Sequence, residues 1–411
     1  MKIGRDGYRP LSGTTARTYP VDDDATLRSQ REDRGTGEAV RQNARTLLGY
    51  AYSPRALAHD PPPSTLQIAG RPFPLGTANV AQAVLTAQAH DLVERSTLSG
   101  SLARIAVAAA PDEALLAVHT AAYLERLRYA AAGGPWDGEH APVTPATWEA
   151  AQLAVGGVLA AVDAVLDGRV GRALVHARPA GHHAEPDRAI ASTYLNNVAC
   201  GAEHARARGA ERVAIVDWDV HVGNGAERIF WDRDDVLAIS LHQQDWYPAH
   251  AGHLGATGGP RAQGCTVNVP LPAATTDAGY LLAFDELVAP IVRGFGPDLI
   301  MVAAGQDASV FDPTGRMLVS AAGFRALAER AADLAGELTG GRIVVSTEGG
   351  YSPVYNPFCL LGVLEGLAGE RGGIPDPWHD DPTVLATQAA ADDRVRSAVA
   401  AVRGAQSRWF A

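Results

Sequence analysis

The stretch that decides the fold is Val213-Ala-Ile-Val-Asp-Trp-Asp-Val-His-Val-Gly-Asn-Gly225. It begins as a continuous apolar run of strand length and ends in two acids, a histidine and a turn flanked by glycines. Such a run is typical of a strand buried on both faces of a parallel sheet. In extended backbone, Asp217, Asp219 and His221 point the same way because single apolar residues separate them. The stretch therefore predicts a strand that delivers ligands for a divalent metal.

Around this stretch, strand-like runs alternate with helical segments. The predicted strands are Ala173 to Ala177, Arg212 to Asp219, Val236 to His242, Thr266 to Leu271, Asp298 to Gly305 and Arg342 to Gly349. Helical apolar spacing fills several intervals, including Asp277 to Phe295 and Ala321 to Leu338. This alternation is typical of a doubly wound α/β fold with a parallel sheet.

The chain before Asn79 gives a weaker pattern. Residues 5–37 are rich in Asp, Arg, Gly and Thr and have no sustained apolar period, and prolines interrupt residues 61–74. We expect residues 1–78 to form an N-terminal arm and loops, leading into one catalytic domain over residues 79–411. The arm would either be disordered, or cap the rim of a site, or pair subunits.

Three helices are predicted ahead of the first of these strands. The first runs from Asn79 to Glu94, with Asn79 as N-cap and Gln82 completing a capping box. The second covers Leu115 to Leu127. The third begins at the Thr144-Pro145 pair and continues to Leu166.

Charge and cysteine content exclude several classes of function. The 411 residues include 35 Lys+Arg and 46 Asp+Glu, so the net charge of -11 gives no bulk attraction to nucleic acid or to anionic membranes. A locally bound cationic substrate is compatible with it. The 3 cysteines form neither a disulfide framework nor a CxxC metal site, and no signal or membrane-spanning segment stands out. We expect a cytoplasmic protein, compatible with a homo-oligomer.

Polar side chains follow four of the predicted strands at their carboxyl ends. They are Arg178-Pro-Ala-Gly-His-His-Ala184, the group Asp217, Asp219 and His221, Gly305-Gln-Asp-Ala-Ser309, and Glu348-Gly-Gly-Tyr351. Each motif alone has an ordinary structural explanation, such as a helix cap or a turn. Because ligands bind at the carboxyl ends of parallel strands, the four together predict one crevice.

The residue types in this crevice indicate metal-assisted hydrolysis. A catalytic zinc keeps three protein ligands and one open position, which Asp219, His221 and Asp307 would satisfy. Asp217 is then left to orient a histidine or to help hold a monovalent cation.

The remaining polar groups of the crevice can act on a bound water and a carbonyl compound. Of His182 and His183, one can act as general base and then acid while the other gives electrostatic support. Tyr351, which follows two glycines, can donate its hydroxyl to a developing oxyanion. These groups together predict hydrolysis of a carbonyl compound, an amide in particular.

These motifs resemble those of the zinc-dependent histone deacetylase superfamily, in the bacterial branch of class II histone deacetylase-like amidohydrolases that includes acetylpolyamine amidohydrolases. The resemblance covers Leu115 to Leu367. It implies an arginase-like three-layer α/β/α fold with a central, mainly parallel eight-stranded sheet and one catalytic Zn2+ at the strand ends. It also implies deacylation of an ε-acyl-lysine or acylated polyamine through a narrow tunnel.

The resemblance also implies roles for individual residues. Asp219, His221 and Asp307 match the zinc ligands, His182 and His183 match the paired histidines with Asp217 and Asn224 as their partners, and Tyr351 matches the transition-state tyrosine. A structural K+ would be bound by Asp217, Asp219 and His221 together with backbone oxygens of Ser240 and Leu241.

The chain departs from the family pattern in the expected substrate tunnel, which would be lined by Ser192, Thr193, Tyr247 and Gly349. Where the family has Gly-Phe-Cys before its Asn-Asn pair, this chain has Ala191-Ser192-Thr193. Ser192 would replace an aromatic wall and Thr193 a cysteine of the acyl pocket. Losing one stacking face weakens contact with a lysine-like stem, and a hydroxyl favours a polar acyl chain.

Two further positions, Val222 and Gln306, differ from the family's histidine and phenylalanine without touching the ligand set. The sequence therefore leaves several functions open. The main hypothesis is a zinc-dependent deacylase acting on an acyl-lysine or a small acylated amine, with altered acyl specificity or with ordinary deacetylase activity. An arginase-like ureohydrolase would need a second set of metal ligands, which the sequence lacks. A metal-binding regulatory protein with little turnover would not need both histidines and Tyr351.

Overall fold

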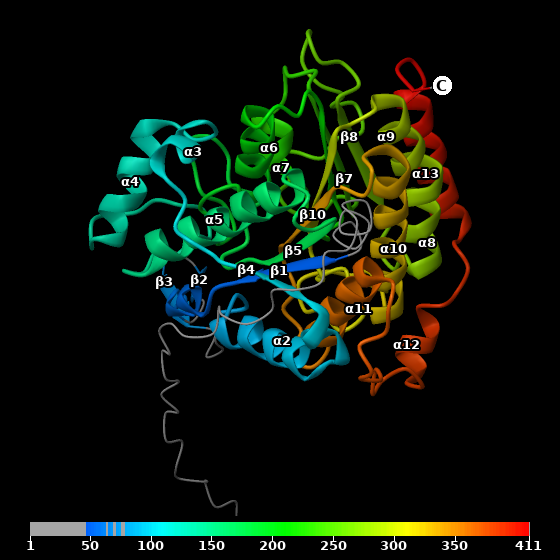
Figure 1. The fold of residues 1–411 in the computed structure, drawn as a ribbon, viewed down its shortest axis with the longest axis horizontal. Coiled ribbons are helices and arrows are strands. Elements are labelled where there is room, and N and C mark those ends of the chain that lie inside the picture. The colour runs from blue at the N-terminus through cyan, green and yellow to red at the C-terminus, as the bar shows by residue number, and fades with distance from the viewer. Residues whose placement is uncertain (1–46, 63–64, 69–70, 75–78, 411) are drawn as a thin grey trace, which may run out of the picture.

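The computed structural model describes residues 47–62, 65–68, 71–74 and 79–410. Its centre is an eight-stranded sheet in which every neighbouring pair of strands is parallel (Figure 1). In spatial order the strands are β4 (Ala103–Ile105), β1 (Leu48–Tyr52), β5 (Arg172–His176), β10 (Ile343–Thr347), β9 (Leu299–Ala304), β6 (Val213–Asp217), β7 (Val236–Gln243) and β8 (Thr266–Leu271). The predicted parallel α/β sheet is confirmed.

Helices cover both faces of this sheet (Figure 1). One face carries α2 (Ala83–Arg95), α8 (Asp277–Ala283), η3 (Phe284–Val288), α9 (Ala289–Phe295), α10 (Ala321–Leu338), α11 (Asn356–Ala368), α12 (Pro382–Ala386) and α13 (Asp393–Gln406). The other face carries α3 (Asp112–Leu116), α4 (Ala121–Ala131), α5 (Thr147–Leu166), α6 (Asn197–Ala207) and α7 (Asn224–Ile229). The short helices η1 (Pro54–Ala58) and η2 (Thr97–Ser101) flank the sheet beside α2.

The strands read as unbroken apolar runs because they are buried on both sides. In β5, Leu174 belongs to the core under α8 to α11, whereas Ala173 and Val175 belong to the core under α3 to α7. All residues of β6 and β9 are buried. Two apolar cores on either side of one sheet give the expected three-layer architecture.

Helix α5 is long and apolar enough to cross a membrane by length and composition. In this structure, however, it packs against β5 and α6, and most of its residues are buried in the core. Its apolar composition is therefore accounted for by burial inside the fold.

The sheet also takes in residues that sequence patterns did not assign to it. The expectation of loops before Asn79 is wrong for Leu48–Tyr52, which form β1 and pair with both β4 and β5. The run is short, and Gly49 interrupts its pattern of apolar side chains. Glycine is needed there, since a Cβ would lie 2.6 Å from Ile105 Cδ1. The small antiparallel pair β2 (Thr65–Ile68) and β3 (Arg71–Pro74) lies in the same region. The expected arm over residues 1–46 falls outside the described residues.

Two helix starts also differ from expectation. Helix α2 begins at Ala83, and Asn79 instead accepts a hydrogen bond from the Ala81 backbone N–H at 2.9 Å in a turn ahead of the helix. The single helix expected over residues 115–127 is divided into α3 and α4. Thr120 caps α4, and its own N–H donates to Pro186 O at 2.8 Å, so a tertiary contact sets the break.

The four strands that carry polar motifs are neighbours in space. The order β5-β10-β9-β6 forms the middle of the sheet, although the strands span residues 172–347 of the chain. Because all four run in the same direction, their carboxyl ends meet at one edge. The topology thus brings the four motifs to one place.

Helical glycines allow a test of the packing between α5 and the chain after β4. A Cβ on the buried Gly156 would lie 1.8 Å from Ala108 O, whereas a Cβ on the exposed Gly336 of α10 would meet nothing within 4 Å. We expect Gly156→Ala to lower the free energy of unfolding by about 1–3 kcal/mol through overpacking. We expect Gly336→Ala to raise it by about 0.5–1 kcal/mol through helix propensity. Urea unfolding measures both, and equal effects would contradict this account of the packing.

Candidate active site and metal centre

Three potential metal ligands converge at the edge where the central strands end. Asp219 and His221 follow β6, and Asp307 follows β9. One ligand atom from each lies within 4.8 Å of the others. The Nδ1 atom of His221 is 3.0 Å from Asp219 Oδ1 and 3.0 Å from Asp307 Oδ2. The structure thus brings together the three residues that the sequence predicted as ligands.

Backbone N–H groups hold the two carboxylates in place. Asp307 Oδ1 accepts from Val220 N at 2.9 Å, and Asp219 Oδ1 accepts from His221 N at 2.9 Å. Asp219 Oδ2 accepts from Gly349 N at 2.8 Å. Each carboxylate is therefore oriented by donors before any cation is bound.

The donor set fits a catalytic zinc ion. Two carboxylates and one imidazole match the three protein ligands that such a site uses, with a further position left for water or substrate. Asp219 is 1% and Asp307 0% exposed, so two neighbouring negative charges are buried and favour a cation between them. Burial lowers the pKa of His221, but hydrogen bonds and charges of the two carboxylates outweigh it and raise that pKa to about 10.

The paired histidines have different hydrogen-bond partners. The Nδ1–H of His182 donates to Asp217 Oδ2 at 2.9 Å, and His182 Nε2 lies 3.7 Å from Asp219 Oδ1. His183 Nδ1 lies 2.6 Å from Asn224 Oδ1. The two rings lie beside each other, with centroids 3.9 Å apart. The structure thus places Asp217 and Asn224 as the predicted partners of the pair.

Because the two rings have different neighbours, their pKa values shift in opposite directions. Burial lowers the pKa of His182, but the charges of Asp219 and Asp217 outweigh it and raise that pKa well above its ordinary value. Burial lowers the pKa of His183 well below its ordinary value, and the neighbouring His182 adds to the effect. The surroundings therefore shift the pKa values of the two imidazoles in opposite directions.

Tyr351 lies beside the same cluster. Its backbone N–H donates to Asp312 Oδ2 at 2.6 Å, which fixes the turn after Gly350. Burial raises the pKa of Tyr351 well above its ordinary value, and the charges of Asp307 and Asp219 add to the shift. The phenol therefore keeps its proton and can act as a hydrogen-bond donor.

The residues expected in the tunnel have different surroundings in the structure. The ring of Tyr247 packs edge-on to His183 and His221, at centroid distances of 5.6 and 6.2 Å. Ser192 lines a narrow cavity of about 50 Å³ together with Tyr351. Thr193 is buried and its hydroxyl donates to Ile190 O at 2.7 Å, so that hydroxyl is already engaged within the loop.

Gly349 contacts the ligand carboxylates directly. A Cβ at this position would lie 2.0 Å from Asp307 Oδ2 and 2.8 Å from Asp219 Oδ2. Gly349 is therefore a close neighbour of the metal ligands, in addition to its predicted place in the tunnel.

The residues assigned to potassium lie on adjacent strands. The register of β6 and β7 places Asp217 opposite Ser240, and Leu241 follows directly. The Ser240 hydroxyl accepts from Gly223 N at 3.1 Å, which ties the loop after β6 to β7. The potassium site stays a prediction.

Sequence patterns gave no role to three acids around the site, of which Glu185 and Asp312 are buried. Glu348 accepts from Gly181 N at 2.6 Å and His182 N at 3.0 Å, and burial raises its pKa to about 8. Asp312 sets the Tyr351 turn, and Glu185 lies behind Asn224. A Pro-Thr pair after Asp312 indicates a turn, and Glu348 stands inside a predicted motif, but neither feature identifies a partner. These acids are recognisable only from contacts across the fold.

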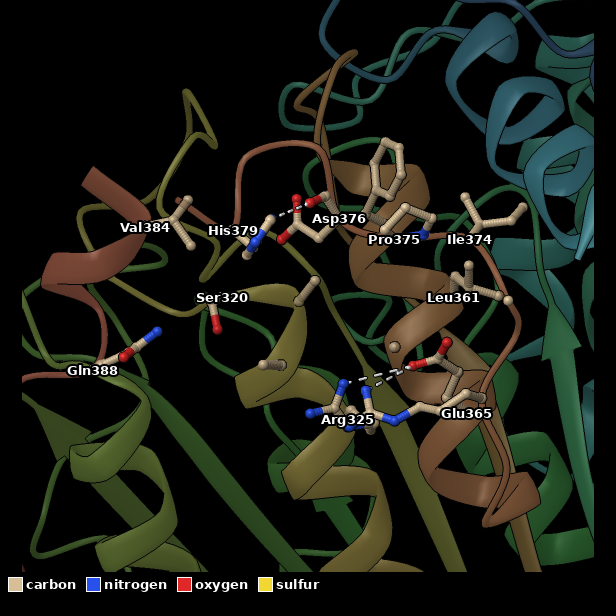
Figure 2. A pocket seen from close by; sticks show the side chains of 16 residues that line it. Ser320, Arg325, Leu361, Glu365, Ile374, Pro375, Asp376, His379, Val384 and Gln388 are labelled. Carbon is tan, nitrogen blue, oxygen red and sulfur yellow. Dashed lines mark hydrogen bonds and ion pairs between the residues drawn. The ribbon is translucent and has the colours of Figure 1, made fainter. Parts of the chain in front are cut away.

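A larger cavity of about 460 Å³ lies elsewhere, between α10, α11 and the chain leading to α12 (Figure 2). Its buried Glu365 is 3.6 Å from Arg325 and 3.5 Å from Arg371. None of the predicted ligands or catalytic residues lines it. The predicted ligands and catalytic residues therefore lie at the strand-end site and not at this larger cavity.

Comparison with known proteins agrees with this geometry. The family model described as "Histone deacetylase domain" matches residues 80–367. The chain belongs to the histone deacetylase family. The matched range ends where the predicted resemblance ends and begins earlier, so it takes in α2.

Curated members of the histone deacetylase family are similar over most of the chain. A histone deacetylase-like amidohydrolase from Pseudomonas aeruginosa is 43% identical over 341 residues, covering 81% of this chain and 87% of that protein. A probable deacetylase from Archaeoglobus fulgidus is 36% identical over 275 residues, covering 66% and 76%. The chain is accordingly an enzyme of the deacetylase type.

A solved structure of a histone deacetylase family member supports the fold assignment. The crystal structure of the HDA15 HD domain superposes with a TM-score of 0.77 at 26% identity, covering 88% of this chain and 95% of that one. The arginase-like arrangement expected from the sequence is therefore confirmed.

Gly349 provides a test of the metal centre in this histone deacetylase family member. We expect Gly349→Ala to displace the carboxylate of Asp307 and to weaken Zn2+ binding by about 10- to 100-fold, the usual loss when support around a ligand is disturbed. Gly255→Ala is the control, since a Cβ on that exposed glycine meets nothing within 4 Å. Competition with a chromogenic chelator gives both dissociation constants. An unchanged constant for Gly349→Ala would contradict the predicted ligand set.

Proposed function

We propose that this protein is a zinc-dependent amidohydrolase that removes an acyl group from an ε-acyl-lysine or a related acylated amine. The observation that carries the proposal is the trio of Asp219, His221 and Asp307, with both carboxylates buried, beside a histidine pair whose members have different partners. A site built only for metal storage has no need of that pair.

When bound, Zn2+ would supply Lewis acidity for the substrate carbonyl and lower the pKa of a water molecule. His183, with Nδ1 turned to Asn224, presents Nε2 as the acceptor for the proton of the attacking water. Tyr351 donates its hydroxyl to the carbonyl oxygen as negative charge develops there. A protonated histidine of the pair then gives a proton to the leaving nitrogen, so the C–N bond breaks and a carboxylic acid and an amine are released.

The proposal includes the context in which the enzyme works. We propose a small acylated amine or an acyl-lysine as the substrate, a structural K+ near Asp217 and Ser240, and a cytoplasmic location. The free and buried state of Cys200, Cys265 and Cys359 supports a reducing compartment. A nucleic-acid or membrane partner is not proposed, because the net charge of -11 does not favour one. We retain one catalytic domain from residue 79 onward, to which β1 adds an earlier strand.

Removing the proposed base or the oxyanion donor tests the mechanism. We expect Tyr351→Phe and His183→Ala each to lower kcat by about 10²- to 10⁴-fold on any substrate that the zinc-loaded protein hydrolyses. A panel of acetyl, longer alkyl, hydroxyacyl and trifluoroacetyl derivatives of lysine peptides and polyamines identifies that substrate. Turnover as fast as wild type in both variants would refute the mechanism, and tight zinc binding without hydrolysis of the whole panel would favour a regulatory role.

Ser192 and Thr193 test the proposed acyl specificity. We expect Ser192→Phe to raise kcat/KM for an acetyl-lysine peptide by about 2- to 10-fold, because an aromatic contact contributes about 0.5–1.5 kcal/mol. Ser192→Ala removes the hydroxyl without adding a ring and serves as the control, and Thr193→Cys is measured in parallel. An unchanged acyl preference in Ser192→Phe and Thr193→Cys, at an unchanged melting temperature, would remove these residues from the specificity assignment.

A further inference from the structure

Glu185 lies two residues after the histidine pair and is surrounded by hydrogen-bond donors. Its side chain is 1% exposed. Arg188 Nε lies 3.0 Å from Oε2, and Arg228 Nε lies 3.0 Å from the same oxygen. Asn224 Nδ2 donates to Oε1 at 2.9 Å, and His250 Nε2 lies 3.2 Å from Oε1. A buried carboxylate with these neighbours stays ionised and can only accept hydrogen bonds.

Two acceptors, the Glu185 carboxylate and the His183 carbonyl oxygen, decide which way the Asn224 amide faces. The Nδ2 end of this amide lies 2.9 Å from Glu185 Oε1 and 3.1 Å from the His183 carbonyl oxygen. Both of these neighbours are acceptors, so that end of the amide must be its NH2 group. The other end is then the oxygen, which faces His183 Nδ1 at 2.6 Å.

The facing of the amide in turn decides the tautomer of His183. An amide oxygen accepts and cannot donate, so the proton of a neutral His183 ring lies on Nδ1. Nε2 then carries the lone pair that the proposed base needs. With the amide reversed, Nδ2 would donate to Nδ1, the ring proton would move to Nε2, and the base would be lost.

We infer that Glu185 is a positioning residue that selects the base-competent tautomer of His183 through the Asn224 amide. The inference rests on the proposed function for its kinetic consequence, and on hydrogen-bond geometry alone for the tautomer. The inference also means that the two histidine rings are oriented in different ways. A carboxylate orients His182 directly, whereas His183 is oriented by a neutral amide, whose NH2 end is held by the Glu185 side chain and by the His183 carbonyl oxygen.

The backbone of Glu185 is itself held by buried contacts. His119 Nδ1 lies 3.0 Å from Glu185 O, and Asn196 N donates to His119 Nε2 at 3.0 Å. Glu185 N also donates to Arg188 O at 3.0 Å. These bonds keep the carboxylate at a fixed distance behind the amide, as positioning requires.

The variant Glu185→Gln removes the carboxylate that accepts from the Asn224 amide, and it changes the shape of the side chain very little. The single oxygen of the new side chain is drawn to Arg188 and Arg228, which leaves its NH2 group facing the NH2 of Asn224. The Asn224 amide then reverses or loses its bonds, and we expect kcat to fall by about 10- to 100-fold. Arg228→Gln is the matched control, because it keeps the Glu185 carboxylate and its bond to Asn224. We expect the control to stay within about twofold of wild type, as for an exposed ion pair.

A double-mutant cycle separates positioning from a general loss of stability. Asn224→Asp alone places two buried carboxylates against each other and should also lower kcat. In Glu185→Gln/Asn224→Asp the new acid accepts from both the Gln NH2 and His183 Nδ1, while the bond to the His183 carbonyl oxygen is lost, and we expect kcat to recover to within about tenfold of wild type. We therefore expect Glu185→Gln to lower kcat when residue 224 is Asn and to raise kcat when residue 224 is Asp. If it lowers kcat equally in both backgrounds, the role of Glu185 is structural and the inference is wrong.

A direct observation of the His183 ring makes the test independent of turnover. In zinc-loaded protein labelled with ¹⁵N-histidine and assigned by the signal missing from His183→Ala, the wild type should show a protonated Nδ1 and Glu185→Gln a protonated Nε2. The same tautomer in both proteins would overturn the inference even if kcat falls. If no substrate is turned over, the proposed function fails while the tautomer still decides the role of Glu185.

Discussion

The site depends on two buried carboxylates, Asp219 and Asp307, directed at one nitrogen of His221. Burying like charges close together is costly unless each is bonded and a positive charge lies near. Backbone N–H groups of Val220, His221 and Gly349 provide bonds, and the His182 ring, whose pKa the charge of Asp219 raises, lies 3.7 Å from Asp219 Oδ1. A cation between the carboxylates would complete the compensation, so the fold favours a metal before any question of catalysis arises.

The parallel sheet makes this concentration of charge feasible. The carboxylates come from β6 and β9, which are adjacent, while β10 on the other side of β9 supplies the Gly349 N–H. The backbone must approach the carboxylates closely at two points. A Cβ on Gly305 would lie 2.2 Å from Asp219 Oδ2, and one on Gly349 would lie 2.0 Å from Asp307 Oδ2. Glycine at these two positions is therefore required by the packing of the charges.

Sequence reasoning recovered what strand periodicity and residue chemistry determine. Six strands of the sheet were predicted, as were the proximity of Asp219, His221 and Asp307 and the contacts of the histidine pair with Asp217 and Asn224. It missed β1 and β4, because a short run such as Leu48–Tyr52 becomes a strand only when neighbouring strands pair along both its edges. It also gave no role to Glu185, because an acid beside two histidines has no meaning until α7 brings Asn224 against it. Contacts between distant segments carry no periodic signal.

The predicted catalytic residues and the predicted tunnel residues also differ in how the fold positions them. The predicted metal ligands follow the ends of β6 and β9, which are paired in register, and the histidine pair lies in the segment after β5. Ser192 lies instead in a loop with a positive φ of 59°, and its hydroxyl donates to His140 O at 3.2 Å. The preceding Ala191 N–H donates to Glu139 O at 2.9 Å, so the conformation of this wall depends on the chain before α5. A substitution in these loops therefore changes the wall at Ser192 without touching the charges at the strand ends.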